Sequence, residues 1–478
     1  MMVICGMSSL RLRSLFVTLF LPALALAAPT DNMLIPAAPH FERLTPRTSD
    51  EQVSAKTLRV SNQQLETQPE LTTALLNQAV RDEAWPVVKS LLPVYERLSA
   101  PDEVLIHYAK AGLARSEGHY GEAIEHYRAI LSTHPDFAAV RLDLARALYE
   151  DRQFDAAEYN FERVNTTNPP PEVAQRINTY LKQVRSQDRV TGNLSVSYLN
   201  DSNVNNASTG KYIRIGDKLF IRNKEAYPQR GEGFWFNGAL QKDVSLYDRH
   251  SLRFLGTITG KSYWNNHRFD DITSRLYVGY RWQDFRQQIA LLPFYEKRWY
   301  GTEAYSSGPG MRAEYSYLLS PSWQISQALE YQKLHYDNAQ YDFLAGDNRY
   351  ISTTLSHVVN ARLSVFFGGD IAWQNTSTAS ETNQRYSLRS GVEADLPWGI
   401  SAGLMGALAK RHYDDDNDIF GVRRQDNEQI GMLSLWHRDL HFMSVMPKLN
   451  FVYKKVNSNI DFYDYTQRNI YLTLDKRF

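Results

Sequence analysis

The side chains best suited to chemistry in this chain are a run of aspartates near its C-terminal end. Asp414, Asp415 and Asp416, with Asp418 just beyond, offer hard oxygen ligands at the close spacing that suits calcium. The glycine and the terminal glutamate of a calcium-binding loop are missing, however. We therefore interpret the run as a solvated surface loop.

Catalytic patterns are weak along the whole sequence. His412 and His437 are isolated, and the cluster His335-Tyr336-Asp337 has no nucleophile motif to match it. No serine lies in a G-x-S-x-G elbow. We expect no enzyme activity, no catalytic residue, no metal and no cofactor.

The last stretch of the chain, from Arg468 to Phe478, alternates between two kinds of side chain. One face carries Ile470, Leu472, Leu474 and Phe478, and the other carries Tyr471, Thr473, Asp475 and Arg477. This is the pattern of a strand with lipid on one side and water on the other. A final strand that ends on an aromatic residue resembles the assembly signal of bacterial outer-membrane barrels. The alternative is the edge strand of a soluble sheet.

Composition is compatible with a membrane barrel. The chain has 478 residues, enough for two or more domains, and its aromatic content is 12% with 29 tyrosines. No apolar run reaches the roughly 18 residues of a helical span, so helical membrane spans are not expected. Aromatic-rich alternating strands give a weak signal each and a polar average hydropathy.

The N-terminus has the layout of a secretory signal, residues 1–27. Arg11 and Arg13 precede an apolar run that ends in Ala25-Leu26-Ala27. Cleavage there removes the lone Cys5 and leaves a net charge of −2, which gives no general attraction to nucleic acid. Residues 28–68, rich in Pro, Thr, Ser and Gln, are expected to be a mobile periplasmic segment.

From residue 69 to 186 the periodicity becomes helical and repeats at roughly 34 residues. The matching positions are Ala111 and Ala145, Tyr120 and Phe154, Ala123 and Ala157, Tyr127 and Phe161, and Pro135 and Pro169. The pattern resembles tetratricopeptide repeats, with two regular units, an irregular pair before them and an end helix over residues 172–184.

Arrays of this kind present a concave groove built from the first helix of each unit. The register places six residues there: Leu105, Tyr108, Arg115, Leu142, Arg146 and Tyr149. We expect a docking groove for a peptide or protein. The alternative is that these residues only pack the helices together or meet solvent.

Residues 190–478 are expected to form an antiparallel transmembrane barrel of about fourteen strands. The expected strands are 190–200, 232–246, 249–265, 270–284, 286–300, 306–320, 322–337, 349–359, 361–376, 382–396, 398–413, 425–438, 440–457 and 466–478. The fold class is therefore multidomain, with an all-α domain followed by an all-β barrel.

The connections between these strands alternate in length. Tight turns such as 247–249 and 284–286 alternate with longer loops such as 338–348 and 414–424. Outer-membrane barrels have short periplasmic turns and long extracellular loops, so the helical domain is expected in the periplasm. Segment 201–231 is too long for a plain turn, and it either enters the barrel or stands outside it.

The layout as a whole, a signal peptide, about three helical repeats and a barrel that ends at Phe478, resembles the surface lipoprotein assembly modulator (Slam) family of Gram-negative bacteria. The resemblance implies an outer-membrane translocon that exports or displays client proteins. The implied clients are surface lipoproteins or secreted haem- or metal-acquisition proteins. The other implied partners are a periplasmic chaperone, the barrel assembly machinery and outer-membrane lipid, with no nucleic acid.

Two other functions remain open. Helical repeats also precede barrels in exopolysaccharide exporters, although those usually carry many more repeats than the three for which this chain has room. A solute porin with a periplasmic tetratricopeptide scaffold is the other alternative.

Overall fold

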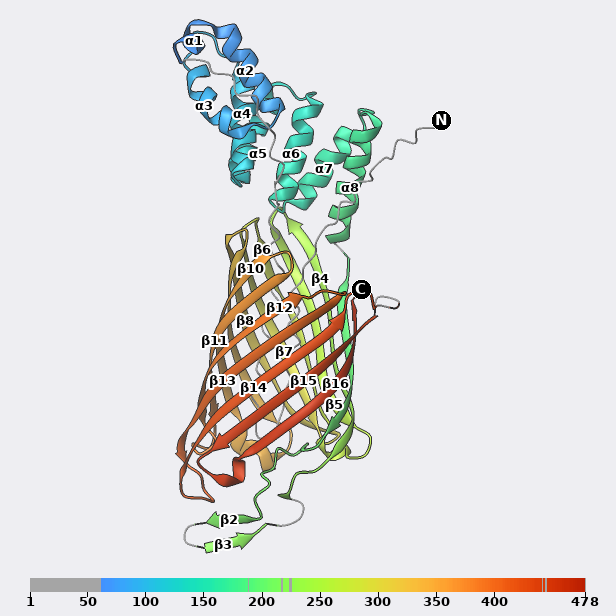
Figure 1. Cartoon of the computed structure of the whole chain (residues 1–478), viewed down its shortest axis with the longest axis vertical. Coiled ribbons are helices and arrows are strands. Elements are labelled where there is room, and N and C mark those ends of the chain that lie inside the picture. The colour runs from blue at the N-terminus through green and yellow to red at the C-terminus, as the bar shows by residue number, and fades with distance from the viewer. Residues whose placement is uncertain are drawn as a thin grey trace.

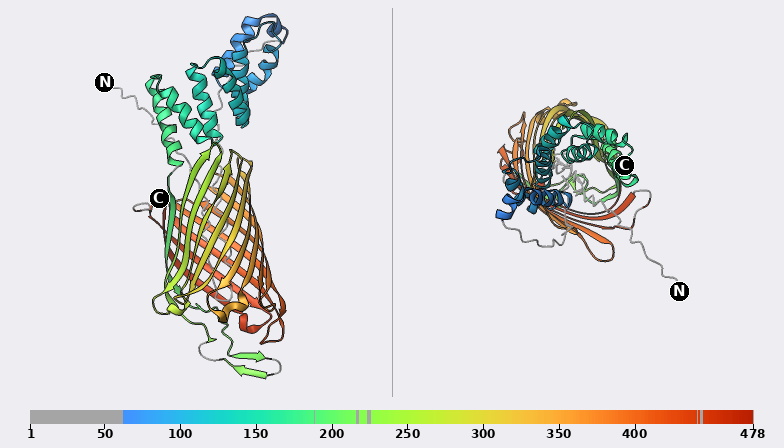
Figure 2. Two further views of the ribbon diagram at one scale, coloured as in Figure 1. Left: turned by 180° about the vertical axis from the view of Figure 1, so that it is seen from behind. Right: turned by 90° about the horizontal axis from the view of Figure 1, so that it is seen from above.

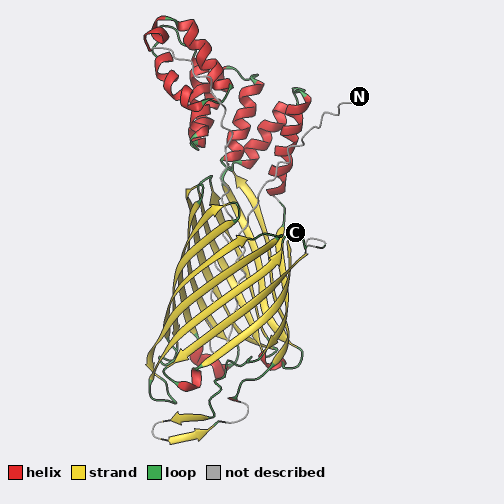
Figure 3. Ribbon diagram, in the orientation of Figure 1, coloured by secondary structure: helices red, strands yellow, loops and turns green. Residues whose placement is uncertain are grey.

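The computed structural model describes residues 62–187, 189–215, 218–222, 226–440, 442 and 445–477. The expected signal peptide, most of segment 28–68 and Phe478 lie outside these residues. A helical domain is followed by a barrel, and the helices gather at one end of it (Figures 1 and 3). We call this end of the barrel proximal and the opposite end distal.

The helical domain is a stack of antiparallel helices. They are α1 (Asn62–Thr67), α2 (Pro69–Arg81), α3 (Trp85–Tyr95), α4 (Glu103–Ser116), α5 (Tyr120–Thr133), α6 (Ala138–Glu150), α7 (Phe154–Asn165) and α8 (Pro171–Gln187). The pairs α4–α5 and α6–α7 are the two regular repeats, α2–α3 is the irregular pair, and α8 is the end helix. None of the described helices is long and apolar enough to cross a membrane.

The repeat residues explain why these helices stack. Ala111, Ala123, Ala145 and Ala157 are all fully buried, which lets the backbones of neighbouring helices approach closely. Phe161 fills the space among them and is fully buried as well. The start of α4 is fixed by a local hydrogen bond: the Asp102 carboxylate accepts from the Val104 amide at 2.8 Å and so caps the helix.

The barrel is closed and antiparallel, and its fourteen strands are the number expected. They are β1 (Thr191–Asp201), β4 (Gly231–Tyr247), β5 (His250–Tyr263), β6 (Asp271–Gln283), β7 (Gln287–Tyr300), β8 (Glu303–Ser320), β9 (Trp323–Tyr336), β10 (Gly346–Asn360), β11 (Leu363–Thr376), β12 (Asn383–Asp395), β13 (Ile400–Asp416), β14 (Arg423–His437), β15 (Val445–Ser458) and β16 (Tyr465–Arg477). Each strand pairs with the next along the chain, and β1 pairs with β16 to close the circle (Figure 2).

The two faces of the strands are those that alternation predicts. Leu276, Phe367 and Leu388 point outward and are more than half exposed on the isolated chain. Ile470, Leu472 and Leu474 of β16 likewise point outward, and Lys476 shares their face. The alternate residues of each strand carry most of the charged and amide side chains, and they point into the barrel.

Short turns lie at the proximal end and longer connections at the distal end (Figure 1). Within segment 201–231, β2 (Tyr212–Ile215) and β3 (Lys218–Ile221) form a hairpin that stands beyond the distal end (Figure 1). The expectation for the strand before the last was wrong at its start: β15 begins at Val445 rather than 440. Among the described residues before it, Phe442 forms an isolated bridge with Val445.

Replacing Phe161 by alanine is expected to destabilise the helical domain by about 3–5 kcal/mol, because a fully packed ring leaves a cavity. Phe137, which is 46% exposed, provides the matched control, and its replacement by alanine should have little effect. Urea unfolding of the full-length, membrane-inserted protein, followed by helical circular dichroism, measures both. Equal losses for the two variants would contradict the packing described here.

Candidate functional site

The first helices of successive repeats are joined by a row of side-chain hydrogen bonds. The Tyr108 hydroxyl of α4 donates to Asp143 Oδ2 of α6 at 2.5 Å. The Arg115 guanidinium donates to both carboxylate oxygens of Glu150 at 2.8 Å. These partners are 35 residues apart, so the row follows the repeat and fixes the spacing of the inner helices.

The same row continues onto the end helix. The Tyr149 hydroxyl of α6 donates to Gln183 Oε1 of α8 at 3.1 Å, 34 residues along the chain. We call the surface formed by this row on α4, α6 and α8 the inner face. Burial raises the pKa of Tyr108, and the adjacent Asp143 carboxylate raises it further, so this hydroxyl stays a donor at neutral pH.

The six residues expected in the docking groove are not equivalent in the structure. Tyr108, Arg115 and Tyr149 belong to the hydrogen-bonded row, and Leu105 is buried in the core between α3 and α4. Leu142 is half-buried, and so is Arg146, which lies 3.2 Å from Asp143 Oδ1. Tyr108, Arg115, Tyr149 and Arg146 therefore lie in or beside the row, and the docking role of all six residues stays a prediction.

Two histidines meet between α4 and α5. The Nδ1 atoms of His107 and His126 are 3.0 Å apart, and their ring centroids are 5.1 Å apart. A hydrogen bond at this distance requires one ring to donate and the other to accept, so at least one ring must be neutral. Burial lowers the pKa of His126, and the charge of a protonated His107 would lower it further.

A second constellation joins the helical domain to the barrel, and we call it the joint. The Arg249 guanidinium, in the turn between β4 and β5, pairs with the Asp151 carboxylate after α6. The Ser245 hydroxyl donates to Asp155 Oδ2, in the first turn of α7, at 2.5 Å. The turn after α6 and the start of α7 are thus held against the proximal rim.

The next barrel turn makes an aromatic contact with the preceding repeat. Phe285, between β6 and β7, meets the Tyr120 ring edge to face, with 4.8 Å between centroids. Gly118 lies against Phe285 in a left-handed conformation, with φ +78°, and a Cβ at this position would sit 3.1 Å from the Phe285 ring. Equivalent turns of two successive repeats therefore contact two successive barrel turns.

The joint is the part of the site that sequence reasoning missed. The sequence assigns Tyr120 only to a repeat position, and it assigns 247–249 and 284–286 only to tight turns. The sequence signal for the joint is that each of these short turns carries a large side chain, Arg249 or Phe285. Pairing them with Asp151 and Tyr120 requires the relative position of the two domains, which periodicity does not contain.

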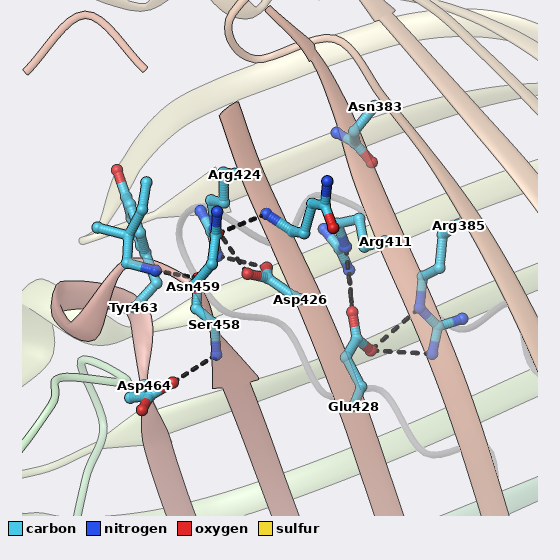
Figure 4. A network of polar contacts seen from close by, with 12 residues as sticks. Asn383, Arg385, Arg411, Arg424, Asp426, Glu428, Ser458, Asn459, Tyr463 and Asp464 are labelled. Atoms are coloured by element: carbon cyan, nitrogen blue, oxygen red, sulfur yellow. Dashed lines mark hydrogen bonds and ion pairs between the residues drawn. The ribbon is translucent and has the colours of Figure 1, made fainter. Parts of the chain in front are cut away.

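The wall of the barrel interior carries arginines that pair with carboxylates on the same strand or on nearby strands. Figure 4 shows Glu428 of β14 between Arg385 of β12 and Arg411 of β13, with closest atoms 3.0 Å apart in both ion pairs. Arg424 and Asp426 pair beside them at 2.8 Å.

Further groups of the same kind line the rest of the wall. They are Asp243 with Arg253 and Arg281, Asp271 with Arg298, Glu330 with Arg275 and Arg312, and Asp370 with Arg389. Each of these arginines therefore has a carboxylate partner on the wall. Fork-shaped arginine–carboxylate contacts also hold these long side chains against the wall.

The clusters considered for metal or catalytic chemistry lie apart from the inner face and the joint. Asp414, Asp415 and Asp416 are exposed at the distal end of β13. Asp337 pairs with Lys297, and His437 contacts the Trp398 carbonyl. Within the part of the chain that the structure describes, no three or more His, Cys, Asp or Glu side chains are placed to hold a metal ion.

Comparison with known proteins decides the family. The model of the surface lipoprotein assembly modifier family matches residues 191–478, and that of its N-terminal tetratricopeptide repeats matches residues 58–161. The chain belongs to this family. The resemblance seen in the sequence is confirmed.

Relatives span nearly the whole chain. Surface lipoprotein assembly modifier 1 of Haemophilus influenzae is 31% identical over 457 residues, which cover 94% of this chain and 93% of that one. The protein of the same name from Neisseria meningitidis is 31% identical over 434 residues, covering 88% and 86%. The hemophilin secretion modulator of Acinetobacter baumannii is 24% identical over 467 residues and covers 94% of both chains.

Membership of the family and the closed barrel establish the location. The protein is an outer-membrane barrel with its helical region in the periplasm, as expected. The proximal end is therefore periplasmic and the distal end extracellular. Family and fold together point to a non-enzymatic role.

Acidification is expected to weaken the helical domain through His126. Its pKa in the folded domain is below the ordinary 6.5, so the neutral ring stabilises the fold above that pH, and this stability is lost as pH falls through and below 6.5. Urea midpoints of the helical domain at about pH 7.5 and about pH 5.5 measure the effect. His126→Gln should reduce the loss, and an identical pH response in this variant would refute the assignment.

The joint is expected to show energetic coupling. A double-mutant cycle with Asp151→Asn and Arg249→Gln should give an interaction energy of about 1–3 kcal/mol, because the Asp151 carboxylate is almost fully buried. Urea unfolding of the helical domain in the full-length protein measures it. The control is the exposed pair Lys89 and Glu117, for which less than about 1 kcal/mol is expected. Additive effects at the joint would mean that the two domains are not held there.

Proposed function

We propose that this protein exports specific client proteins across the outer membrane, either to be displayed on the surface or to be released. The observation that carries the proposal is the family match over both domains, together with a joint that fixes the repeat array at the periplasmic rim of the barrel. The names of the relatives, which concern surface lipoproteins and the secretion of hemophilin, support the same class of activity.

In this proposal the helical domain and the barrel have separate roles. The inner face of α4, α6 and α8 docks the client, with Arg146 and Leu142 as half-buried contact residues between the buried row and solvent. The joint at Asp151 and Arg249 keeps this face beside the barrel mouth. A client released there meets the entrance within one domain length, so its effective concentration is high.

The remaining partners are part of the same proposal. A periplasmic chaperone delivers the client unfolded, because a folded domain is wider than the space inside a barrel of this size. The barrel assembly machinery recognises the last strand through Ile470, Leu472, Leu474 and Phe478, of which the first three lie on the lipid face of β16. No catalytic step is required of the chain.

The test is surface display of a client in a laboratory bacterium. Each secreted or lipid-anchored protein encoded beside this gene is tagged and expressed with or without this protein, then scored by protease shaving and in the medium. The expected result is a client outside the cell only when the protein is present. A client that stays in the periplasm beside a properly inserted barrel would favour polysaccharide export or a solute porin.

Arg146→Glu is expected to lower client display about tenfold, the effect of losing one interface arginine contact worth about 1.4 kcal/mol. Arg128→Glu makes the same charge change on α5, where the side chain is exposed outside the inner face, and should leave display unchanged. Quantitative shaving at equal barrel abundance compares the two. Equal display by both variants would remove the inner face from the docking role.

A further inference from the structure

The ladder between β1 and β16, which we call the seam, is the shortest in the barrel. Among the described residues it consists of six register pairs, from Asn193 with Arg477 to Tyr198 with Leu472. Every other pair of neighbouring barrel strands shares at least eleven. Fewer backbone hydrogen bonds must therefore break to part the strands here than anywhere else on the circumference.

On the extracellular side, both strands continue beyond the last register pair of the seam. β16 continues from Tyr471 back to Thr466 toward the extracellular end, in register with β15. Over the same stretch it has no register pairing with β1, although Leu199, Asn200 and Asp201 remain paired with β4. The periplasmic half of the seam is thus a regular ladder, and its extracellular half is an edge of β16.

Side chains bridge the extracellular half in place of the ladder. Gln467 Nε2 donates to the Asn203 carbonyl at 2.8 Å. Arg222, which donates to the Ser208 carbonyl at 2.6 Å, lies with its guanidinium 5.2 Å from the centroid of Phe462, in the loop before β16. These contacts tie the β1–β4 loop to β16 and to the loop before it across the seam, and they can separate without breaking any strand pair.

An unpaired strand edge at this depth needs a partner. Backbone groups in a bilayer are satisfied internally, and an edge persists only where protein or water covers it. The β1–β4 loop provides that cover in the closed barrel, through its buried residues Asn203 and Val204. When the loop moves away, the edge is free to bind an extended segment by strand addition.

We propose that the extracellular half of the seam is the exit for a lipid-anchored client, and that the edge of β16 from Thr466 to Tyr471 pairs with an extended segment of that client. This inference rests on the proposed export function. Acyl chains are driven to stay in hydrocarbon, so a lipid anchor needs an opening between the barrel interior and the leaflet. An opening that begins at the extracellular half and extends past the Ser197–Thr473 pair delivers the anchor to the outer leaflet, while the periplasmic end of the ladder, at Asn193 and Arg477, stays closed.

Closing the seam with a disulfide tests the exit. Ser197 Oγ and Thr473 Oγ1 are 2.6 Å apart across the last regular part of the ladder, so the double variant Ser197→Cys with Thr473→Cys can form a bond there. Ser316 and Ser326, whose Oγ atoms are 3.5 Å apart between β8 and β9, provide the matched pair away from the seam. Cysteine is absent from the chain beyond Cys5, so neither bond has a competitor within the barrel.

The probe is the tagged lipoprotein whose display depends on the wild-type protein. We expect the oxidised seam variant to lose display at least about tenfold and to regain it on reduction, while the single-cysteine variants and the oxidised β8–β9 variant keep it. Complete oxidation of the seam with undiminished display would overturn the proposal, as would equal loss in both disulfide variants. Absence of display by the wild type would instead refute the export function.

A measurement without a client tests the edge itself. In the wild-type protein in lipid nanodiscs, residue-resolved hydrogen exchange should be at least about tenfold faster for the β1-facing amides of residues 466–471 than for those of residues 472–476. The β15-facing amides of the same strand serve as the internal control. Uniform protection along β16 would show that its edge is closed to a partner strand.

Discussion

The structure depends on one constraint: a backbone inside a bilayer must satisfy its hydrogen bonds within the protein. Fourteen strands meet it by closing a circle, and closure joins the first strand of the barrel to the last. Because lipid lies outside the barrel and water inside it, outward-facing and inward-facing residues alternate along the strands, as in β6 and β11. The position of the helical domain follows as well, because both ends of an even-stranded barrel lie on the same side of the membrane.

The helical domain is held together by a different set of interactions. Repeats that stack through small residues such as Ala111 and Ala145 form a rigid arm, and hydrogen bonds such as Tyr108 to Asp143 keep its inner helices in step. The arm is attached where the turns of two repeats meet two barrel turns, at Arg249 and Phe285. A rigid arm with a defined attachment places its inner face at a fixed distance from the barrel mouth.

Much of this architecture can be predicted from sequence, because the signals are local. Alternation predicts all fourteen barrel strands and the lipid face of β16, and the 34-residue spacing predicts the two helix pairs α4–α5 and α6–α7. The joint, the β2–β3 hairpin and the late start of β15 are not predictable in this way. Asp151 and Arg249 are 98 residues apart, and nothing in either neighbourhood specifies the other. The groove role of Leu142 and Arg146 also depends on a partner that the chain does not contain.

The paired charges of the interior wall have a consequence for movement through the barrel. The group of Glu428 with Arg385 and Arg411 has one positive charge in excess, whereas Glu330 with Glu296, Glu314, Arg275 and Arg312 has one negative charge in excess, so neither sign dominates both groups. Under the proposed export function, a polypeptide that passes these groups meets charges of both signs, each already held by an opposite charge. One interior can then serve segments of very different sequence.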